Sequence, residues 1–599
     1  MSHALDVFGW FDNEYDGEGF RTCSVTSFDV HRSVENYVKL YGVTAVVFLL
    51  IGGIFAFTIA MTRWEAIGLL EPGDYYRHLS MHAWSMLIFW IIFMEIAILY
   101  VGGPMVLGRK LPAKWAAAAG YVVMLAGSVL IYYSIWTVSG DPTSDNAPLL
   151  TAYVPLEINP LFYVSAIVFL IGVTLAALPF LLTLWDEKRE NPGKTLPLVT
   201  FGAFVAAIIA VQSILGGLIA FGGALAWQLG YAPWFDASIY RQWFWIIGHG
   251  TQQINLVAMI VVWYLVTHVI GGAEVVSEKV SRTAFILYLF FIVMGAAHHL
   301  MVDPGLSAGW RIWNTSYAFY GATFASLIHA FTIPAGLEAG RRKRGKGGGL
   351  FGWLTSAPWR NPVFASSIFA IILFGFLGGI TGVLMGQLQL NMSWHNTFAT
   401  VGHFHSTVVL GTTLTFMGVV YFVIRTMFMR EFVSPKLTTL QPYLYSGGMA
   451  LTALMMMYVG ILYGIPRRTA EVVENIPGTD FSIAGAAPLF DVFGLVAIFA
   501  IGGGALFVLL AVGSLLFGDR IEPGDGDLAP DGGSTTQQAT DSRTIAPRND
   551  LEQAEDPDDP VHAYEMRGTF VLCLIFLAVF VVAYILNWFL LTQLWSIGA

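Results

Sequence analysis

Long apolar runs alternate with short polar stretches along almost the whole chain. Runs long enough to cross about 30 Å of hydrocarbon recur about thirteen times. They cover residues 41–61, 77–103, 114–135, 160–184, 197–223, 240–269, 282–303, 310–335, 363–389, 397–428, 440–464, 487–517 and 567–595. With 56% hydrophobic and 12% charged residues, the 599-residue chain has too little charge for a soluble globular protein. The pattern predicts an all-α membrane protein with about thirteen transmembrane helices.

The Lys and Arg residues between the runs predict the orientation. The second, fourth, eighth and tenth runs are followed by "GRKLPAK", "DEKRENPGK", "GRRKRGKGG" and "RTMFMREFVSPK". Short basic loops stay in the cytoplasm, so we expect a multi-pass protein of the inner (cytoplasmic) membrane with its N-terminus in the cytoplasm. The acidic, polar start of the chain lacks the features of a cleavable signal peptide.

Four parts are predicted along the chain. They are a cytoplasmic N-terminal tail (1–37), a twelve-helix catalytic core (38–517), a polar cytoplasmic linker (518–566) and an additional C-terminal transmembrane helix (567–599). Cys23 and Cys573 are the only cysteines, and they provide neither a disulfide framework nor a thiolate metal site. The predicted surroundings are the lipid bilayer, and no feature of the chain predicts nucleic-acid binding.

One apolar run contains the polar sequence "HGTQQINLVAM" at residues 249–259. A membrane helix normally excludes such a cluster, because each polar group loses water without a guaranteed partner. Gln253 follows His249 by one helical turn, so the two side chains share a face. The cluster therefore predicts a functional site. Thr251, Gln252 and Asn255 fit either a supporting role beside that site or helix packing.

Six histidines fall at a similar depth once the predicted orientation is applied. Four lie near the outer start of runs that go inward, and two lie near the outer end of a run that goes outward. A single intramembrane histidine, such as His78 or His329, is as often a packing residue as a ligand. Six at one level favour cofactor binding, because neutral imidazole is a common ligand of iron and copper. The six are His82, His249, His298, His299, His403 and His405.

The spacing of these histidines predicts two kinds of site. His403 and His405 lie about 200° apart around a helix, so one helix can serve a cofactor on each face. His298 and His299 differ by about 100° and can reach one metal only near a helix end. The following Asp-Pro-Gly at 303–305 supplies that end. Together with His249 they form a three-histidine site with an open position.

Several long motifs then occur in order. They are "MHAWSMLIFW", "GGPMVLG", "RQWFWIIGHG", "AAHHLMVDPG", "WHNTFATVGHFHSTVVLGTTLTFMG" and "GIPRR". Over nearly its whole length the chain resembles subunit I of the heme–copper oxidase superfamily, most closely the B-type branch. The resemblance implies a heme–copper oxidase-like helical bundle. It also implies two hemes, which would be non-covalent because a CxxCH motif is absent.

The resemblance also assigns roles to individual residues. His82 and His405 would be the axial ligands of a low-spin heme, and His403 the ligand of a high-spin heme. The second metal would be held by His249, His298 and His299. Arg467 and Arg468 would pair with heme propionates, because guanidinium groups suit carboxylates, and His395 would reach a propionate as well. For the two arginines, the alternative role is anchoring at the membrane interface.

One position departs from the pattern. In oxygen-reducing A- and B-type members, a tyrosine follows the first metal-binding histidine by four residues, and here that position is Gln253. An amide does not readily donate an electron or an acidic proton. The branch with its tyrosine on the seventh helix does not match either, since Leu300, Met301 and Val302 follow the histidine pair. Familiar nitric oxide reductases carry a glutamate here that coordinates iron.

Gln253 is therefore predicted to place an oxygen at the three-histidine site, which favours iron over copper. The leading hypothesis is a nitric oxide reductase that reduces two nitric oxide molecules to nitrous oxide and water. The alternative is a B-type terminal oxygen reductase with copper at the three histidines. A heme-binding transporter or sensor is a third class, disfavoured because it needs no separate three-histidine site.

The sequence also contains candidate residues for proton supply, and the resemblance implies partner proteins. Tyr264 occupies a place where the B-type inner proton path also has a tyrosine, although Ile260 interrupts that path. Glu338 fits either a point of proton uptake or an ordinary charge at a helix end. The resemblance implies a cupredoxin-like subunit II or a similar small membrane-anchored subunit. The electron donor would be a c-type cytochrome, a cupredoxin or quinol.

Overall fold

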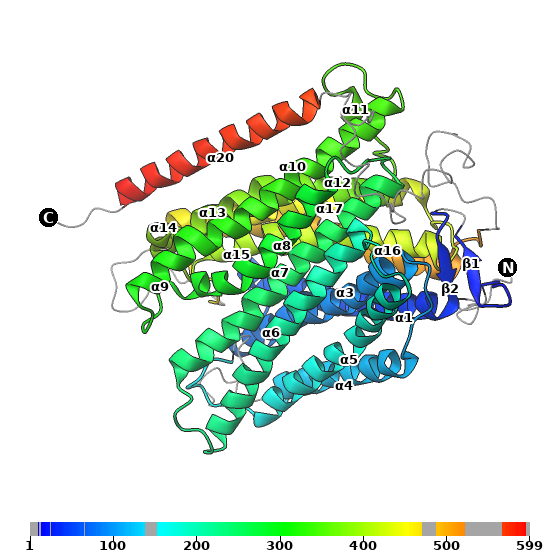
Figure 1. Ribbon diagram of the computed structural model, residues 1–599. Coiled ribbons are helices and arrows are strands. Elements are labelled where there is room, and N and C mark those ends of the chain that lie inside the picture. The colour runs from blue at the N-terminus through cyan, green and yellow to red at the C-terminus, as the bar shows by residue number, and fades with distance from the viewer. Residues whose placement is uncertain are drawn as a thin grey trace.

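The computed structural model describes residues 10, 13–23, 26–64, 66–137, 152–469, 487–521 and 566–594. Long helices lie side by side in one bundle, and a short β-hairpin lies at one end of it (Figure 1). The strands β1 (Phe20–Thr22) and β2 (Asp29–His31) pair antiparallel, with Phe20 opposite His31. The predicted class, an all-α membrane protein, is confirmed with this hairpin as a minor addition.

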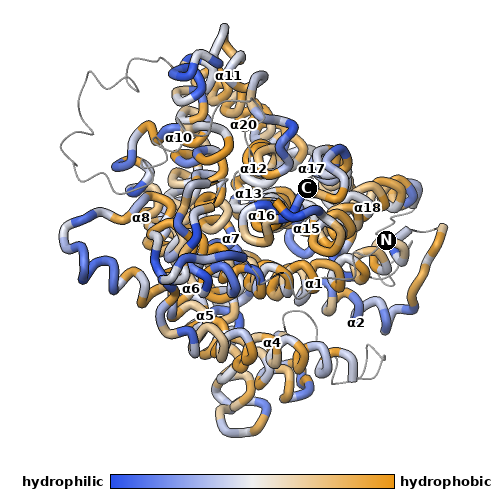
Figure 2. The backbone as a smooth tube through the Cα atoms, turned by 90° about the vertical axis from the view of Figure 1, so that its right-hand side faces the viewer, coloured by the Kyte–Doolittle hydropathy of each residue, from blue (hydrophilic) through white to orange (hydrophobic). Residues whose placement is uncertain are grey.

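Eleven helical stretches in the described chain are long and apolar enough to cross a membrane. They are Arg32–Arg63 (α1), Pro72–Met105 (α2, η2, α3 and η3), Lys114–Trp136 (α4), Pro160–Glu190 (α5), Leu198–Gln228 (α6), Ala237–Val269 (α7), Pro362–Met385 (α12, η6 and α13), Phe398–Thr426 (α15, η7 and α16), Pro435–Tyr463 (α17), Pro488–Phe517 (in α18, Ala487–Phe517) and Arg567–Leu590 (in α20, Arg567–Leu594). Most helices are hydrophobic over their length, and hydrophilic segments lie mainly in the connections (Figure 2). This distribution suits a bundle surrounded by lipid.

The two remaining predicted runs, 282–303 and 310–335, also form helices, but these are interrupted or more polar. The first is α8 (Glu278–Met294), which changes into the 3₁₀ turn η4 (Gly295–Leu300). The second comprises α9 (Ala308–Ile312), η5 (Trp313–Ala318) and α10 (Phe319–Lys343). Because α10 carries polar groups such as His329 and Glu338, it is less apolar than the eleven stretches above.

Several long helices contain a π-helical segment, in which the turn widens. The segments are η2 (Trp84–Phe89), η3 (Val101–Met105), η5 (Trp313–Ala318), η6 (Phe374–Gly379) and η7 (His405–Thr413). The segment η3 follows α3 (Trp90–Tyr100). The others divide α2 (Pro72–Ala83) from α3, α9 from α10, α12 (Pro362–Leu373) from α13 (Ile380–Met385), and α15 (Phe398–Phe404) from α16 (Leu414–Thr426). π segments occur frequently at functional sites, and here one begins at His405 and another two residues after His82.

Helix α1 begins within the predicted N-terminal tail (1–37). Its first residue is Arg32, and His31 is its cap. The buried Glu35 carboxylate lies 2.6 Å from both Arg21 and Lys39. These paired charges made the first turns of α1 look like a polar tail in sequence. Most of the predicted linker, residues 522–565, lies outside the described residues.

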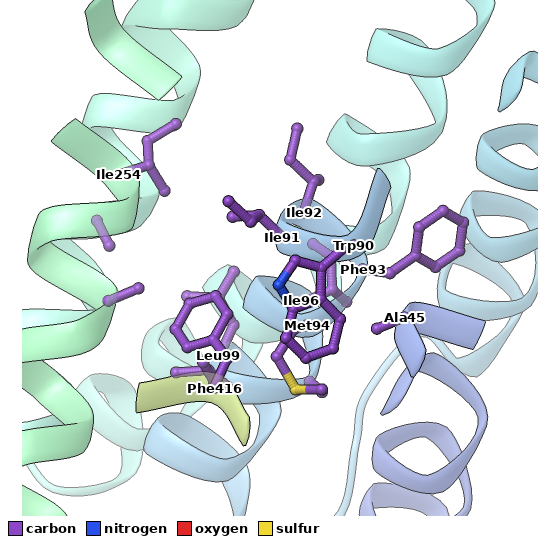
Figure 3. Packing of buried hydrophobic residues seen from close by; sticks show 14 of the residues in the cluster. Ala45, Trp90, Ile91, Ile92, Phe93, Met94, Ile96, Leu99, Ile254 and Phe416 are labelled. Atoms are coloured by element: carbon purple, nitrogen blue, oxygen red, sulfur yellow. The ribbon is translucent and has the colours of Figure 1, made fainter. Parts of the chain in front are cut away.

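Aromatic and aliphatic side chains fill the centre of the bundle. All eleven residues of α3 are buried. Figure 3 shows apolar side chains of α3, such as Ile92, Phe93 and Met94, that point to different sides of the helix. Helix α7 begins at a standard cap, where the Asp236 side chain accepts the backbone N–H groups of Ser238 and Ile239, each at 2.9 Å. These two helices, α3 and α7, form part of the wall of the site described below.

Glu338 fixes the last helix to the bundle. Its buried carboxylate accepts the Gly568 N–H at 3.0 Å and both the N–H and the hydroxyl of Thr569, at 2.6 and 2.7 Å. It also pairs with Arg342 at 2.8 Å. A carboxylate at a helix N-terminus is favoured by the exposed N–H groups and the helix dipole. These contacts favour the helix-end role over proton uptake.

Replacement of Glu338 by alanine should therefore loosen the start of α20. Three hydrogen bonds to a charged group are lost, and we expect a destabilisation of this contact by about 2–4 kcal/mol. Hydrogen–deuterium exchange at residues 567–572 measures it directly. The control is Glu274→Ala, which removes a partly exposed pair with Lys343 worth no more than about 1 kcal/mol. Equal exchange in the two variants would contradict the capping role.

Candidate functional site

A cavity of about 1030 Å³ lies in the bundle and gathers most of the predicted site residues. This is about the upper limit for a single small-ligand pocket, so the cavity suits more than one large cofactor. Tyr264 and Glu338 do not line it. The predicted residues in its wall are His82, His249, Gln253, His298, His299, His395, His403, His405, Arg467 and Arg468.

Three histidines converge on one point. His249, His298 and His299 each offer a ring nitrogen within 4.8 Å of the others. Nδ1 of His249 and Nε2 of His299 are 3.2 Å apart, about the separation of two nitrogens bound to one metal ion at 2.0–2.1 Å. His298 and His299 lie in the 3₁₀ turn η4. The tighter turn lets these two neighbouring residues direct their rings to the same point. This donor set fits a divalent transition metal.

Neighbouring groups hold these rings in place. Nδ1 of His298 lies 2.6 Å from the Gly295 carbonyl. The ring of His299 stacks on Trp245, with centroids 3.9 Å apart and planes 7° from parallel. Such supporting contacts fix the orientation of a ligand ring. Gln253, one turn after His249 on α7, lines the same cavity.

His403 and His405 face different partners, as their spacing predicted. His403 lies near His298 and has Nδ1 2.9 Å from the Thr381 hydroxyl. His405 lies near His82 instead. Its Nδ1 is 2.8 Å from the Val401 carbonyl, and Nδ1 of His82 is 3.0 Å from the Gly52 carbonyl.

A ring nitrogen that donates to a carbonyl leaves the opposite nitrogen free for a metal. Both His82 and His405 have this arrangement, and both line the cavity. The pair therefore fits two axial ligands of one heme. His403, held through Nδ1 on the opposite side of the same helix, fits a ligand of a second heme beside the three-histidine group.

Positive charge gathers at one end of the cavity. Arg467 and Arg468 are largely buried there. Burial, together with the neighbouring Arg468, lowers the pKa of Arg467 to about 10, so the guanidinium remains charged at neutral pH. Nε of Arg467 is buried and has no hydrogen-bond partner within the part of the chain that the structure describes. A buried N–H of a charged guanidinium group is costly without an acceptor, and an anion is the acceptor that suits it best.

Heme propionates satisfy that requirement, since they are carboxylates carried by a large apolar ring. His395 lies at the same end of the cavity. Its pKa is lowered to about 4, mainly by burial and also by the positive charge of Arg467. His395 is therefore neutral at pH 7 and can donate or accept a hydrogen bond. The cavity, the histidine pairs and the arginines thus fit two hemes and one metal.

Sequence reasoning missed several residues at this end. Arg241 pairs with Asp303 at 2.9 Å and lies over the Tyr153 ring, whose hydroxyl accepts the indole N–H of Trp245 at 2.8 Å. Arg63 donates to the Thr469 carbonyl at 2.6 Å and so holds the loop that carries the two arginines. Arg241, the first residue of "RQWFW", could have been noticed as a charge at the start of an apolar run. Its partner Asp303 could not, because it lies 62 positions further along the chain.

Tyr264 lies in a separate hydrogen-bonded group. Its hydroxyl is 3.0 Å from the Ser281 hydroxyl, 3.0 Å from Nδ1 of His329 and 2.9 Å from the Thr332 hydroxyl. The His329 ring stacks on Tyr288. The Tyr288 hydroxyl in turn lies 2.9 Å from Ser326, which lines the large cavity. Polar side chains therefore run from Tyr264 to the cavity wall.

The comparisons with known proteins agree with this geometry. Residues 36–493 match the family described as cytochrome c and quinol oxidase polypeptide I. The chain is 30% identical over 421 residues to cytochrome c oxidase subunit 1 of Thermus thermophilus, covering 67% of this chain and 71% of that protein. It is 23% identical over 459 residues to the Bacillus subtilis protein of the same name, covering 73% and 68%.

A solved structure of a heme–copper terminal oxidase dimer has a similar fold, with a TM-score of 0.74 at 23% identity. The match covers 86% of this chain and 91% of that one.

Proposed function

Because the chain belongs to the heme–copper oxidase subunit I family, whose members bind hemes and a metal at a histidine site, we propose that it is the catalytic subunit of a membrane-bound nitric oxide reductase. The proposed reaction converts two nitric oxide molecules, two electrons and two protons into nitrous oxide and water. One observation carries the proposal: Gln253 lines the histidine cavity at the position where oxygen-reducing relatives are expected to have a tyrosine.

The residues around the site support two-electron chemistry. Splitting oxygen calls for a group that supplies a further electron and proton, and an amide supplies neither readily. Reduction of nitric oxide needs no such group. In the proposal His82 and His405 bind a low-spin heme, and His403 binds a high-spin heme. The non-heme metal is held by His249, His298 and His299, with the Gln253 oxygen beside it.

These cofactors, when bound, supply electrons and coordination positions for the substrate. The chain holds them in a water-poor interior: His249 is buried, and the rings around it pack against Trp245 and one another. The group formed by Tyr264, His329 and Thr332 offers protonatable side chains that lead toward the cavity. We include Tyr264 in the proposed proton path. Glu338, the other residue predicted for it, caps α20.

A second candidate function is a B-type terminal oxygen reductase with copper at the three histidines. The names of the relatives favour it, since the similar proteins of Thermus thermophilus and Bacillus subtilis are cytochrome c oxidase subunits. The two candidates differ at the non-heme metal. An amide oxygen beside three imidazoles suits iron, whereas copper sites favour softer or nitrogen ligands.

Metal analysis of the purified protein separates the two candidates. We expect about three iron atoms per chain, two in hemes and one non-heme, with copper well below one equivalent. The heme content, measured by pyridine hemochrome absorbance, gives the baseline for the iron count. One copper per chain with iron only in the hemes would overturn the iron assignment and favour oxygen reduction.

Family members usually work with other subunits in a membrane. For this chain we propose a cupredoxin-like subunit II or a similar small membrane-anchored subunit in the inner membrane. Electrons would come from a c-type cytochrome, a cupredoxin or quinol. The cytoplasmic position of the N-terminus, proposed from the basic loops, places Arg467 and Arg468 on the outer side.

The arginines should set the reduction potential of a heme. Arg467→Leu removes a buried positive charge, so the reduced heme loses stabilisation. We expect its midpoint potential to fall by about 60 mV, a tenfold change for one electron. Spectroelectrochemical titration measures the shift. Arg360→Leu is the control, because Arg360 does not line the cavity within the described chain. Equal potentials in the Arg467 variant and wild type would argue for simple interfacial anchoring.

A further inference from the structure

A buried carboxyl group lies beside the histidine cavity without an assigned role. Glu95 sits in the middle of α3 and is 6% exposed. The residues that line a small cavity together with Glu95 are mainly apolar, among them Ile92, Ile96 and Ile254. No ion pair to Glu95 occurs among the residues that the structure describes. An isolated carboxylate in such surroundings is costly by several kcal/mol, so this group holds a proton at rest.

Asn255 of α7 is the polar partner of this carboxyl. The end of its amide lies 2.7 Å from Oε1 of Glu95 and 2.8 Å from the Thr251 carbonyl. Because the Thr251 carbonyl only accepts hydrogen bonds, the amide nitrogen faces both oxygens. Oε1 of Glu95 is then the accepting oxygen, and Oε2 carries the proton. Asn255 is itself 2% exposed, so this contact is shielded from bulk water.

The carboxyl is one side chain away from the histidine cavity. With the Asn255 nitrogen on Glu95, the Asn255 amide oxygen faces the Gln252 side-chain amide at 3.3 Å, and Gln252 lines that cavity. A second, small cavity of about 50 Å³ lies between α3, α5, α6 and α7 and is lined by Glu95, Ser213 and Thr251 among aliphatic residues. Its volume has room for roughly three waters. Four residues line both cavities, and Thr251 is the polar one among Ile92, Leu170 and Ile247.

The depth of Glu95 in the bundle, relative to the three histidines, bears on its role. Asn255 follows His249 by six residues, about 9 Å along α7 in the direction away from Arg467 and Arg468. In the proposed orientation, this places Glu95 on the inner side of the three histidines. A reaction that consumes protons from the inner aqueous phase needs a proton-holding group at this level.

We propose that Glu95 holds and delivers a proton for reduction at the three-histidine site. The proposal rests on the proposed function only in that the reaction consumes protons, as the reduction of either nitric oxide or oxygen does. In nitric oxide reduction, an external electron donor supplies the two electrons, one at a time. The O–H bond at Oε2 breaks, its proton forms an O–H bond of the product water, and the carboxylate regains a proton from inner-phase water. A second proton arrives in the same way, which completes the two that the reaction uses.

The direct test is Glu95→Gln, which keeps the shape and the contact to Asn255 but carries no transferable proton. Steady-state turnover should fall at least about tenfold, while heme spectra and metal content stay at wild-type values. Glu95→Asp should recover a substantial part of the rate. The matched control is Glu187→Gln, which alters another buried carboxylate, paired with Arg109 at the end of α5 away from both cavities, and should leave turnover unchanged.

A second measurement does not depend on turnover. Infrared difference spectra between oxidised and reduced enzyme should contain a carboxylic C=O band that shifts in Glu95→Asp and is lost in Glu95→Gln. Turnover of Glu95→Gln within twofold of wild type, or spectra in which all variants share the same carboxylic bands, would overturn the proposal. If wild-type enzyme reduces oxygen and not nitric oxide, the proposed function fails. Glu95→Gln then slows oxygen turnover if the proton role is correct.

Discussion

His82→Ala should abolish the absorbance of the low-spin heme while leaving part of the high-spin heme signal intact. The substitution removes one of the two histidines that would hold this heme and leaves His405 alone, so the heme would be lost or its spectrum changed. His403 lies on the other side of its helix, held by Thr381, and should retain its heme. Reduced-minus-oxidised spectra and heme quantification measure both effects. Electron delivery to the catalytic site, and with it turnover, should be lost.

The control for this variant is His78→Ala, one helical turn earlier. His78 lies 2.8 Å from the Thr58 hydroxyl, stacks on Trp136 and does not line the cavity in the described structure. Its loss should leave both hemes in place. A normal low-spin spectrum in His82→Ala would remove His82 as a ligand, and with it the assignment of the pair.

Gln253→Leu should weaken metal retention or slow turnover by about tenfold or more, as loss of a partner close to a metal typically does. The change removes the one candidate oxygen ligand at this position and keeps a side chain of similar size. Metal analysis and nitric oxide turnover on the same preparation measure it. Full metal content with a wild-type rate would mean that Gln253 serves only helix packing.

Two further substitutions of Gln253 test separately whether its oxygen binds the non-heme metal and whether a tyrosine there is enough for oxygen reduction. Gln253→Glu keeps an oxygen in place and should keep iron together with nitric oxide turnover. Gln253→Tyr should not create an efficient oxidase, because the covalent link to His249 and a matching proton path are also required. An efficient oxygen reductase produced by this single change would show that the rest of the site is already built for oxygen.

The long apolar runs predicted the helices well where the helix ends are apolar. The run 487–517 coincides with α18, whereas α1 begins nine residues before the predicted start at 41. Those residues include Glu35 and Lys39, which are buried only because they pair with each other and with Arg21. A hydropathy pattern counts such charges as exposed.

The histidines could be placed from sequence because depth follows from the helix direction, and because helical spacing determines which side of a helix a residue faces. This reasoning separated His403 from His405, and the structure gives them different partners. Contacts between distant segments carry no such signal. The pairing of Arg241 with Asp303, and the contact between Glu95 and Asn255, exist only once α3, α7 and the end of η4 are packed together.

The central claim is that this histidine site, with Gln253 in its wall, reduces nitric oxide. The most direct test gives one purified preparation nitric oxide and oxygen in separate assays, with the same artificial electron donor. We expect nitrous oxide to form from nitric oxide in a one-to-two ratio, at a rate well above oxygen consumption. Rapid oxygen consumption with no nitrous oxide formed would contradict the account and identify an oxygen reductase without the expected tyrosine.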